Sequence, residues 1–218
     1  MHYKDRYEAG RTLAQNLEGL RGEPDVIVLG IPRGGVVVAF EVARALDAAL
    51  DVYITRKIGV PYNPELAIGA VASDGTVFVE QDLANHLGIT SEYIEAETAR
   101  QREEIQRRLT LYRGERQAPE LKDKTVIVVD DGIATGATVR VALRALRHQS
   151  PRKLILAVPV GPLDTISKLR HEADEVVCPL TPSSFWAVST FYTNFDQTGD
   201  EEVIHLLNQA VVGRELTQ

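Results

Sequence analysis

The chain alternates short apolar runs with helical patterns, and this order constrains the fold more than any other feature of the sequence. Six runs have the length and β-branched content of buried strands, at 26–29, 52–55, 77–80, 126–129, 154–160 and 175–178. Helical patterns lie between most of them, at 35–46, 137–148 and 163–171. The alternation predicts an α/β fold with a doubly wound, mainly parallel sheet. In such sheets ligands bind beyond the carboxyl ends of the strands.

Three segments depart from simple alternation. Residues 5–20 are expected to form an amphipathic leading helix. Residues 91–113 are expected to form a long and mostly exposed helix, which Gly114 would end. Residues 180–199 are rich in aromatic and turn residues and precede a closing helix at 201–211.

The domain organisation follows from what lies between these elements. We find no internal repeat, linker or low-complexity tract, so one domain over residues 1–218 is expected. Its core would span about 21–180. The leading helix at 5–20 would precede this core, and a small hood at 180–218 would follow it.

Composition argues against several classes of protein. The formal net charge is −7 and the pI is near 5.3, whereas an obligate nucleic-acid partner would require a basic surface. Cys178 is the only cysteine, which excludes an intrachain disulfide and a cysteine-based zinc site. The N-terminus has no apolar signal-peptide core, and no run approaches the length that spans a bilayer. We therefore expect a soluble, cytoplasmic protein without nucleic-acid or membrane partners.

The string VIVVDDGIATGATV at 126–139 carries the strongest chemical signal. An apolar strand ends in two carboxylates, Asp130 and Asp131, and a small, hydroxyl-bearing turn then opens a helix. The first amides of a helix lack backbone partners and the helix dipole adds positive charge there, so the turn suits an anion. The string has neither the lysine of the common triphosphate loop nor the GxGxxG pattern of dinucleotide folds. A single phosphate is the expected ligand of the turn.

The two acids need a separate explanation, because they repel each other and the phosphate expected beside them. Two unit charges about 5 Å apart repel by about 3 kcal/mol at an effective dielectric constant of roughly 20. Neighbouring sugar hydroxyls donate hydrogen bonds in pairs and carboxylates accept them in pairs, so Asp130 and Asp131 suit a ribose 5-phosphate. A Mg²⁺ ion near the same hydroxyls would relieve the repulsion. The alternative is a plain Asp-Asp-Gly turn with a helix cap, which many α/β proteins could contain.

The complete string resembles the phosphoribosyl diphosphate (PRPP) signature of type I phosphoribosyltransferases and matches it at every defining position. The resemblance implies a Rossmann-like phosphoribosyltransferase fold with a small hood, PRPP as a substrate and Mg²⁺ as a cofactor. Asp130 and Asp131 would contact the ribose hydroxyls and act in catalysis, with Mg²⁺ held on the PRPP near them and not by direct protein ligands. The remaining substrate-binding residues of the string, mostly around the 5′-phosphate, would be Gly132, Ala134, Thr135, Gly136, Ala137 and Thr138.

A second stretch that supports the resemblance is GIPRGG at 30–35, directly after the first predicted strand. It is similar to the pyrophosphate-binding loop of xanthine–guanine enzymes. The resemblance implies that Arg33 and the amides of Gly34 and Gly35 bind the diphosphate at the start of the following helix. Taken alone, the stretch could be a strand-to-helix turn that requires glycines.

A third stretch, ITRKIG at 54–59, resembles the Arg-Lys pair of adenine and orotate enzymes, which also reaches the pyrophosphate. A basic pair is usually surface charge. Here it stands where the second strand is expected to end, and this placement favours Arg56 and Lys57 as pyrophosphate ligands. Lys57 would also act as an electrostatic catalyst.

Departures from the family's motifs leave the acceptor open. Orotate enzymes carry further basic residues in a mobile catalytic loop, but segment 59–75 has none. Hypoxanthine-type enzymes have an acid where Ala134 stands, and alanine is seen there in adenine- and uracil-type motifs. The nucleobase therefore cannot be read from the motifs.

Residues 185–195 hold five aromatic side chains. In this family a variable hood covers the nucleobase, so Phe185 and Trp186 are candidates for a wall that stacks on a flat base. A local aromatic core explains such a cluster equally well.

The resemblance favours an enzyme of nucleotide salvage, a Mg-dependent pentosyltransferase that moves the ribose 5-phosphate of PRPP to a nucleobase-like nitrogen acceptor and releases pyrophosphate. One alternative is a PRPP- or nucleotide-sensing regulator that kept the site without turnover. Arg33 and the Arg56-Lys57 pair disfavour it, because a sensor of nucleoside monophosphates need not bind pyrophosphate. Another is a phosphosugar-binding protein of a different class, which leaves the acids without a role unless its ligand is also a ribose. Family members are often dimers, so a homodimer is compatible with the resemblance, although no residue marks an interface.

Overall fold

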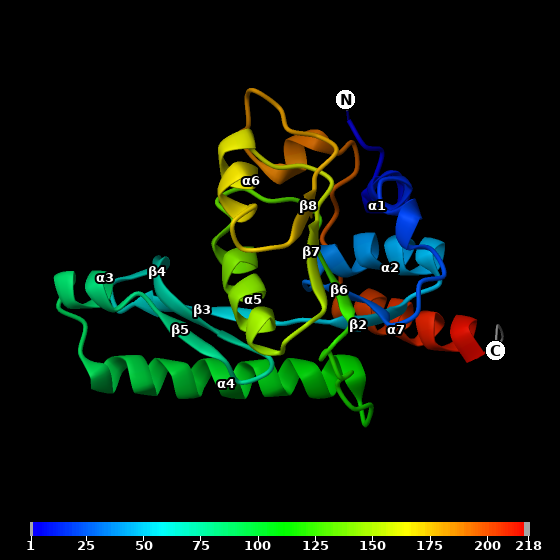
Figure 1. Ribbon diagram of the computed structural model, residues 1–218. Helices are drawn as coiled ribbons and strands as arrows, with labels where there is room; N and C mark the ends of the chain where they lie inside the picture. The colour runs from blue at the N-terminus through cyan, green and yellow to red at the C-terminus, as the bar shows by residue number, and fades with distance from the viewer. Residues whose placement is uncertain (1, 216–218) are drawn as a thin grey trace.

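The computed structural model describes residues 2–215, and its centre is a five-stranded parallel sheet (Figure 1). The strand order is β2-β1-β6-β7-β8, and all four pairings are parallel. The strands are β1 (Val26–Gly30), β2 (Ala49–Val52), β6 (Thr125–Val129), β7 (Lys153–Ala157) and β8 (Glu175–Val177). The predicted α/β fold with a mainly parallel sheet is confirmed.

Helices cover both faces of this sheet. Side chains along a strand point alternately to its two faces. Val126 and Val128 of β6 therefore pack against the layer of α5 and α6, and Ile127 and Val129 against the layer of α1 and α2 (Figure 1). The bounds are α1 Arg6–Gln15, α2 Gly34–Leu46, α5 Ala137–His148 and α6 Leu163–Leu169. The sheet is doubly wound, as the alternation of the sequence predicts.

Between β2 and β6 the chain forms an arm that projects from the parallel sheet (Figure 1). The arm holds a second, antiparallel sheet in the order β3-β4-β5, in which β3 pairs with β4 and β4 with β5. Ile58 and Ile68 of this sheet pack with Ile105 and Leu109 of α4, which give that helix its thin apolar stripe. The arm's elements are β3 (Thr55–Val60), β4 (Asn63–Ala72), β5 (Val77–Val79), α3 (Gln81–His86) and α4 (Ser91–Arg113).

Two predicted strands differ from the structure. The run at 52–55 is not one strand, because β2 ends at Val52 and β3 begins at Thr55. The run is apolar because it connects two cores: Tyr53 packs in the core of the parallel sheet and Ile54 in that of the arm. The run at 77–80 forms β5, but in the antiparallel sheet. Apolar runs report burial and do not say which sheet a strand joins.

The segments at the two ends of the chain also differ in detail from the prediction. α1 ends at Gln15, and a short 3₁₀ turn at Glu18–Leu20 replaces the last turn of the helix predicted at 5–20. The closing helix α7 (Asp200–Glu215) begins one residue earlier than predicted and packs against α2, α4 and β2. The aromatic segment of the predicted hood, residues 180–199, leads into α7 as mostly irregular chain with a 3₁₀ turn at Val188–Phe191.

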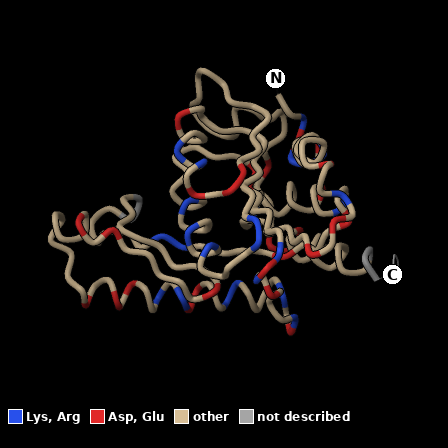
Figure 2. The backbone as a smooth tube through the Cα atoms, in the orientation of Figure 1, with Lys and Arg blue, Asp and Glu red and all other residues tan. Residues whose placement is uncertain are grey.

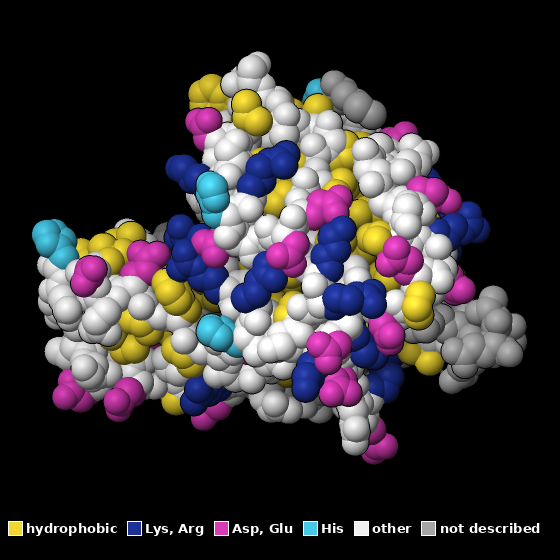
Figure 3. All heavy atoms as spheres, viewed as in Figure 1, with side chains coloured by type: hydrophobic (Ala, Val, Ile, Leu, Met, Phe, Trp, Pro, Cys, Tyr) yellow, Lys and Arg dark blue, Asp and Glu magenta, His cyan; other side chains and the backbone are white. Residues whose placement is uncertain are grey.

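Charged residues are interleaved over the surface. Glu and Arg are interspersed along α4 (Figure 2). On the face shown in Figure 3, basic and acidic side chains are interspersed. Arg144 and Arg147 of α5 pair with acids that follow α6: Arg144 with Glu172 at 2.7 Å and Arg147 with Asp174 at 3.0 Å. Within residues 2–215, no helix combines the length and apolar character that crossing a membrane requires.

Candidate functional site

The turn between β6 and α5 presents a helix start at the carboxyl edge of the parallel sheet. Gly136, the residue before α5, has a backbone φ of +73°, which residues other than glycine rarely adopt. The Thr165 hydroxyl donates to the Ala134 carbonyl at 3.0 Å and holds the turn against α6. Gly136 has no side chain to cap the first amides of α5, and the Ala137 N–H makes only a long contact of 3.5 Å with the Thr135 hydroxyl oxygen, so the start of the helix suits an anion. The turn therefore has the form that the phosphate prediction requires.

The register of the sheet brings the glycine-rich loop to the acid pair. Gly30, the last residue of β1, pairs with Val129, the last residue of β6, so the loops that follow the two strands start side by side. A Cβ atom on Gly35 would lie 2.9 Å from the Cα of Asp130, and one on Gly34 would overlap the Asp131 carboxylate. The glycines thus let the start of α2 contact the acids directly.

Both acids are largely but not fully buried, and the Asp131 side chain is 15% exposed. Burial raises the pKa of Asp130 well above its usual range, and the neighbouring Asp131 charge raises this pKa further. Burial also raises the pKa of Asp131, against the opposing effect of a hydrogen bond from Arg6. Asp130 Oδ1 accepts the Asp131 backbone N–H at 2.8 Å. Two buried, mutually repelling acids destabilise the ionised site, and such groups cluster at functional sites.

Arg6 of α1 is the cation beside this pair, and sequence reasoning missed it. Its Nε donates to Asp131 Oδ2 at 2.7 Å, and its Nη1 donates to the Asp196 carbonyl at 2.7 Å. The guanidinium carbon also lies 3.8 Å from the centre of the Phe195 ring. The leading helix and the segment before α7 therefore meet at Asp131. No local signal identifies Arg6, because nothing in the sequence of α1 distinguishes it from Arg11, the other arginine of this helix.

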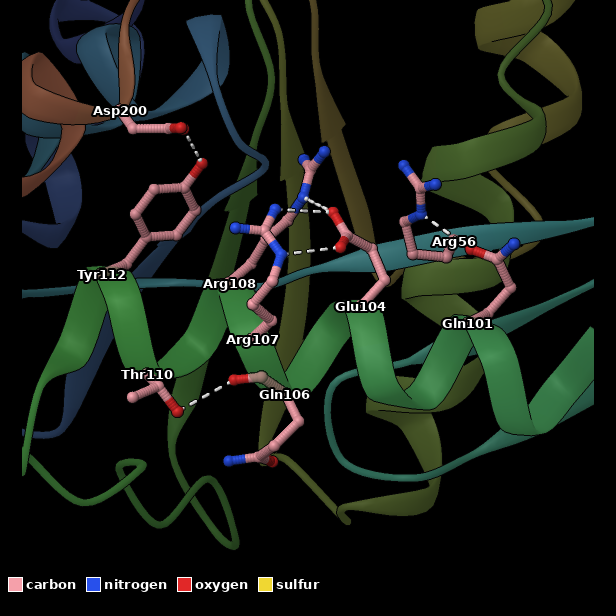
Figure 4. A network of polar contacts seen from close by, with 9 residues as sticks. All are labelled: Arg56, Gln101, Glu104, Gln106, Arg107, Arg108, Thr110, Tyr112 and Asp200. Atoms are coloured by element: carbon pink, nitrogen blue, oxygen red, sulfur yellow. Dashed lines mark hydrogen bonds and ion pairs between the residues drawn. The ribbon is translucent and has the colours of Figure 1, made fainter.

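Arg33 lies at the start of α2 and faces the start of α7. Its Nη1 is 4.0 Å from Asp200 Oδ1, and the peptide bond between Pro32 and Arg33 is cis. The Tyr112 hydroxyl of α4 donates to the same Asp200 oxygen at 2.5 Å (Figure 4). Burial and this hydrogen bond raise the pKa of Tyr112 to about 12. The predicted diphosphate loop is thus bordered by α7 and the end of α4.

Arg56 and Lys57 do not end a strand of the parallel sheet; they lie inside β3 of the arm. Both nevertheless line a cavity of about 450 Å³ together with Thr138, the second residue of α5. α4 forms another wall of this cavity, with Tyr93 among its residues. The structure therefore brings the predicted basic pair to the phosphate turn by a different route from the one the sequence indicated.

The aromatic segment packs at the other side of the acid pair. Phe185 stacks on Phe191, with ring centres 5.3 Å apart, inside a small aromatic core, whereas Trp186 is 89% exposed. The Tyr192 hydroxyl donates to the Asp131 carbonyl at 2.5 Å. Gly132 lies under the same segment, since a Cβ there would be 2.5 Å from a Val188 methyl group. The segment thus borders the site, with Phe185 engaged in its own cluster.

The chain is similar to known proteins over most of its length. It matches the family model "Phosphoribosyl transferase domain" over residues 2–196, and it belongs to that family. It is 46% identical over 208 residues to the "Putative phosphoribosyl transferase Rv0571c" of Mycobacterium tuberculosis, a match that covers 95% of this chain and 47% of that protein. The chain thus spans about half the length of the M. tuberculosis relatives it matches.

Two further proteins are similar over much of the chain. The crystal structure of TT1426 from Thermus thermophilus superposes with a TM-score of 0.84 at 40% identity, covering 96% of this chain and 99% of that one. The "Bifunctional protein PyrR" of Clostridium novyi is 27% identical over 145 residues, covering 66% of this chain and 62% of that protein. The phosphoribosyltransferase fold expected from the motif is therefore confirmed.

Proposed function

We propose that this domain transfers the ribose 5-phosphate of PRPP to a nucleobase-like nitrogen acceptor. The bond between the anomeric carbon and the diphosphate breaks, a carbon–nitrogen bond forms, and the acceptor nitrogen loses its proton. The observation that carries the proposal is the cavity of about 450 Å³ that Arg56 and Lys57 line together with Thr138 of the phosphate turn. A cavity that borders both the basic pair and the phosphate turn suits a sugar with a phosphate at one end and a diphosphate at the other.

Each part of the site has a role in this proposal. The turn Ala134–Thr138 binds the 5′-phosphate through the first amides of α5. Asp130 and Asp131 accept hydrogen bonds from the ribose hydroxyls. Arg33, the Gly34 and Gly35 amides, Arg56 and Lys57 bind the diphosphate and stabilise its charge as it leaves. Gly132, Phe185 and Trp186 border the acceptor side.

Mg²⁺ fits this arrangement as a partner of the substrate. Among the described residues no group of three or more His, Cys, Asp or Glu side chains is placed to hold a metal. Mg²⁺ commonly binds one or two carboxylates together with substrate phosphates and waters, and Asp130 and Asp131 are the carboxylates at hand. When bound on PRPP, the ion would neutralise charge on the departing pyrophosphate.

The wider context follows from the same reaction. We assign the chain to one domain with the aromatic segment as its hood, and we place it in cytoplasmic nucleotide salvage because PRPP and free nucleobases are its substrates. A homodimer is compatible with this assignment. The proposal concerns only the domain that this chain represents and not the full length of its longer relatives, because the chain matches about half of each of them.

The test is pyrophosphate release from Mg-PRPP across a panel of purine and pyrimidine bases. We expect release with one base or a small set. The Asp130→Asn/Asp131→Asn double variant should lose PRPP binding, because the ribose hydroxyls lose both carboxylates. An Asp82→Asn/Asp164→Asn variant is the matched control, since both of these aspartates are exposed.

Each outcome separates the candidate functions. Base-dependent release that the site variant abolishes supports the enzyme. PRPP binding without release on any base supports the alternative, a sensor that kept the site without turnover. Unchanged PRPP affinity in the site variant contradicts the assignment of the acids.

A further inference from the structure

Gln101 is a buried amide on an otherwise charged and exposed helix. It is 5% exposed, although most of its neighbours on α4 face solvent. Both ends of the amide are used: Oε1 accepts a hydrogen bond from Arg56 Nε at 2.9 Å, and Nε2 donates to Glu97 Oε1 at 2.6 Å. Fixing a buried glutamine side chain by hydrogen bonds at both ends costs conformational entropy. Its position beside Arg56, a predicted ligand of the substrate, gives a functional reason for this cost.

The chemistry of the two partners sets the orientation of this amide. Arginine has donors only, so it must meet the amide oxygen. Glu97 also accepts two hydrogen bonds from Arg100, which are the first cause of its lowered pKa, so it is an ionised acceptor that must meet the amide nitrogen. The hydrogen-bond chain from Arg56 through Gln101 to Glu97 therefore allows only one orientation of the Gln101 amide. It holds Arg56 by Nε, and Figure 4 shows the terminal nitrogens pointing away from α4.

Arg56 stands where three cavities meet. It lines the cavity of about 450 Å³, the cavity of about 420 Å³ along α4 and a small one of about 50 Å³ beside α5. The first and the last of these also contain Thr138 of the phosphate turn. A guanidinium held in this position borders the same cavities as the start of α5, and its planar fork suits phosphate oxygens.

We propose that α4 is part of the substrate site, with Gln101 as a positioning residue that orients the Arg56 guanidinium toward a diphosphate. The ligand class is a diphosphate, either that of PRPP or free pyrophosphate. The assignment of the PRPP end rests on the proposed function. A neutral amide suits this role because it orients the guanidinium and leaves its charge for the ligand. A carboxylate at the same position would form an ion pair with Arg56 and compete with the ligand.

The test compares Gln101→Glu and Gln101→Met with Gln106→Met, a control on the same helix. Gln106 is exposed, and its side chain lies on the side of α4 opposite Arg56 (Figure 4). Inorganic pyrophosphate, ribose 5-phosphate and PRPP are titrated in the presence of Mg²⁺ by calorimetry. We expect both Gln101 variants to bind pyrophosphate and PRPP about tenfold more weakly, with ribose 5-phosphate affinity unchanged. The Gln106 variant should match the unmodified protein with all three ligands.

Two results would overturn the proposal. One is pyrophosphate affinity unchanged in both Gln101 variants. The other is an equal loss for ribose 5-phosphate, which would indicate a general disturbance of the site; melting curves of each variant show that it is folded. The proposed function is judged separately. If the Asp130→Asn/Asp131→Asn variant binds PRPP normally, that function fails, while the pyrophosphate titration still decides the role of Gln101.

Discussion

Asp130 shows at the scale of one residue how a ligand site opposes stability. Its carboxyl is buried beside a second acid, and its pKa is raised. An acid whose pKa is higher in the folded than in the unfolded state binds its proton more tightly when folded. Stability is therefore greatest when Asp130 is protonated, and it falls as the pH rises from about 4 through the raised pKa.

We expect Asp130→Asn to raise the stability of the free protein at pH 8 by about 1–2 kcal/mol, because the neutral isostere removes a buried charge. This corresponds to a melting temperature roughly 2–8 °C higher for a chain of this size. The gain should shrink as the pH is lowered toward 4. Thermal unfolding across this pH range is the measurement, with Asp82→Asn as the exposed control. A variant less stable than the parent at pH 8 would contradict the argument.

Arg6 gives a second prediction at this scale. Its side chain and that of Asp131 are 11% and 15% exposed, so the ion pair is largely buried. Arg6→Gln leaves a buried carboxylate without its cation, and we expect a loss of about 3 kcal/mol in the free energy of unfolding. Arg11→Gln on the same helix should cost under about 1 kcal/mol, because Arg11 is 53% exposed and 3.8 Å from Glu41. Urea unfolding compares the two, and equal losses would show that the buried pair has no special weight.

At the scale of the element, only a few apolar residues of α4 pack against the arm's sheet and the rest of the molecule. Ile105 is 4% exposed and packs with the arm's sheet and with α7 residues such as Val203. Leu111 on the same helix is 40% exposed. Because the buried apolar residues lie on one stripe, this helix of 23 residues keeps one face toward the protein although its sequence is mostly polar.

We expect Ile105→Ala to destabilise the protein by about 2–4 kcal/mol, since it removes buried methyl groups and leaves a cavity. Leu111→Ala should cost under about 1 kcal/mol, because a large loss of stability on truncation to alanine requires a buried side chain. Denaturant unfolding measures both. If the two variants lose the same stability, the thin apolar stripe that contains Ile105 is not what holds α4 in place.

At the scale of the whole molecule, the two sheets differ in how they are covered. β1 and β6 are buried at every residue between two helical layers. β5 is half-buried throughout, and Tyr62 in the β3–β4 turn is 98% exposed. The arm is therefore held by fewer buried apolar contacts than the parallel sheet, and local opening should begin there.

Hydrogen exchange followed by mass spectrometry tests this difference. Peptides that cover 61–90 are expected to exchange well before those that cover 125–129 and 153–157, because the arm can open without unfolding the parallel sheet. PRPP should slow exchange in β3 if it binds across Arg56 and the phosphate turn. Simultaneous exchange of the arm and the parallel sheet would show a single cooperative unit.

The sequence by itself determined the parts of this protein that are local. The run 126–129, the acids and the turn at 130–138 are contiguous, so an apolar strand, a carboxylate pair and a helix start can be read in order. The α/β class follows in the same way from the spacing of apolar runs. The roles of the site residues remain predictions, to be tested by the variants above.

The tertiary structure alone decided which distant side chains contact the predicted site residues. Arg6 reaches Asp131 across 125 positions of sequence, and Gln101 reaches Arg56 across 45. The same holds for the division of the run 52–55 between two sheets. Periodicity reports burial and capping within one element, but a hydrogen bond between elements depends on how their helices and strands pack. That packing is settled by the cores as a whole, and no single stretch of residues records it.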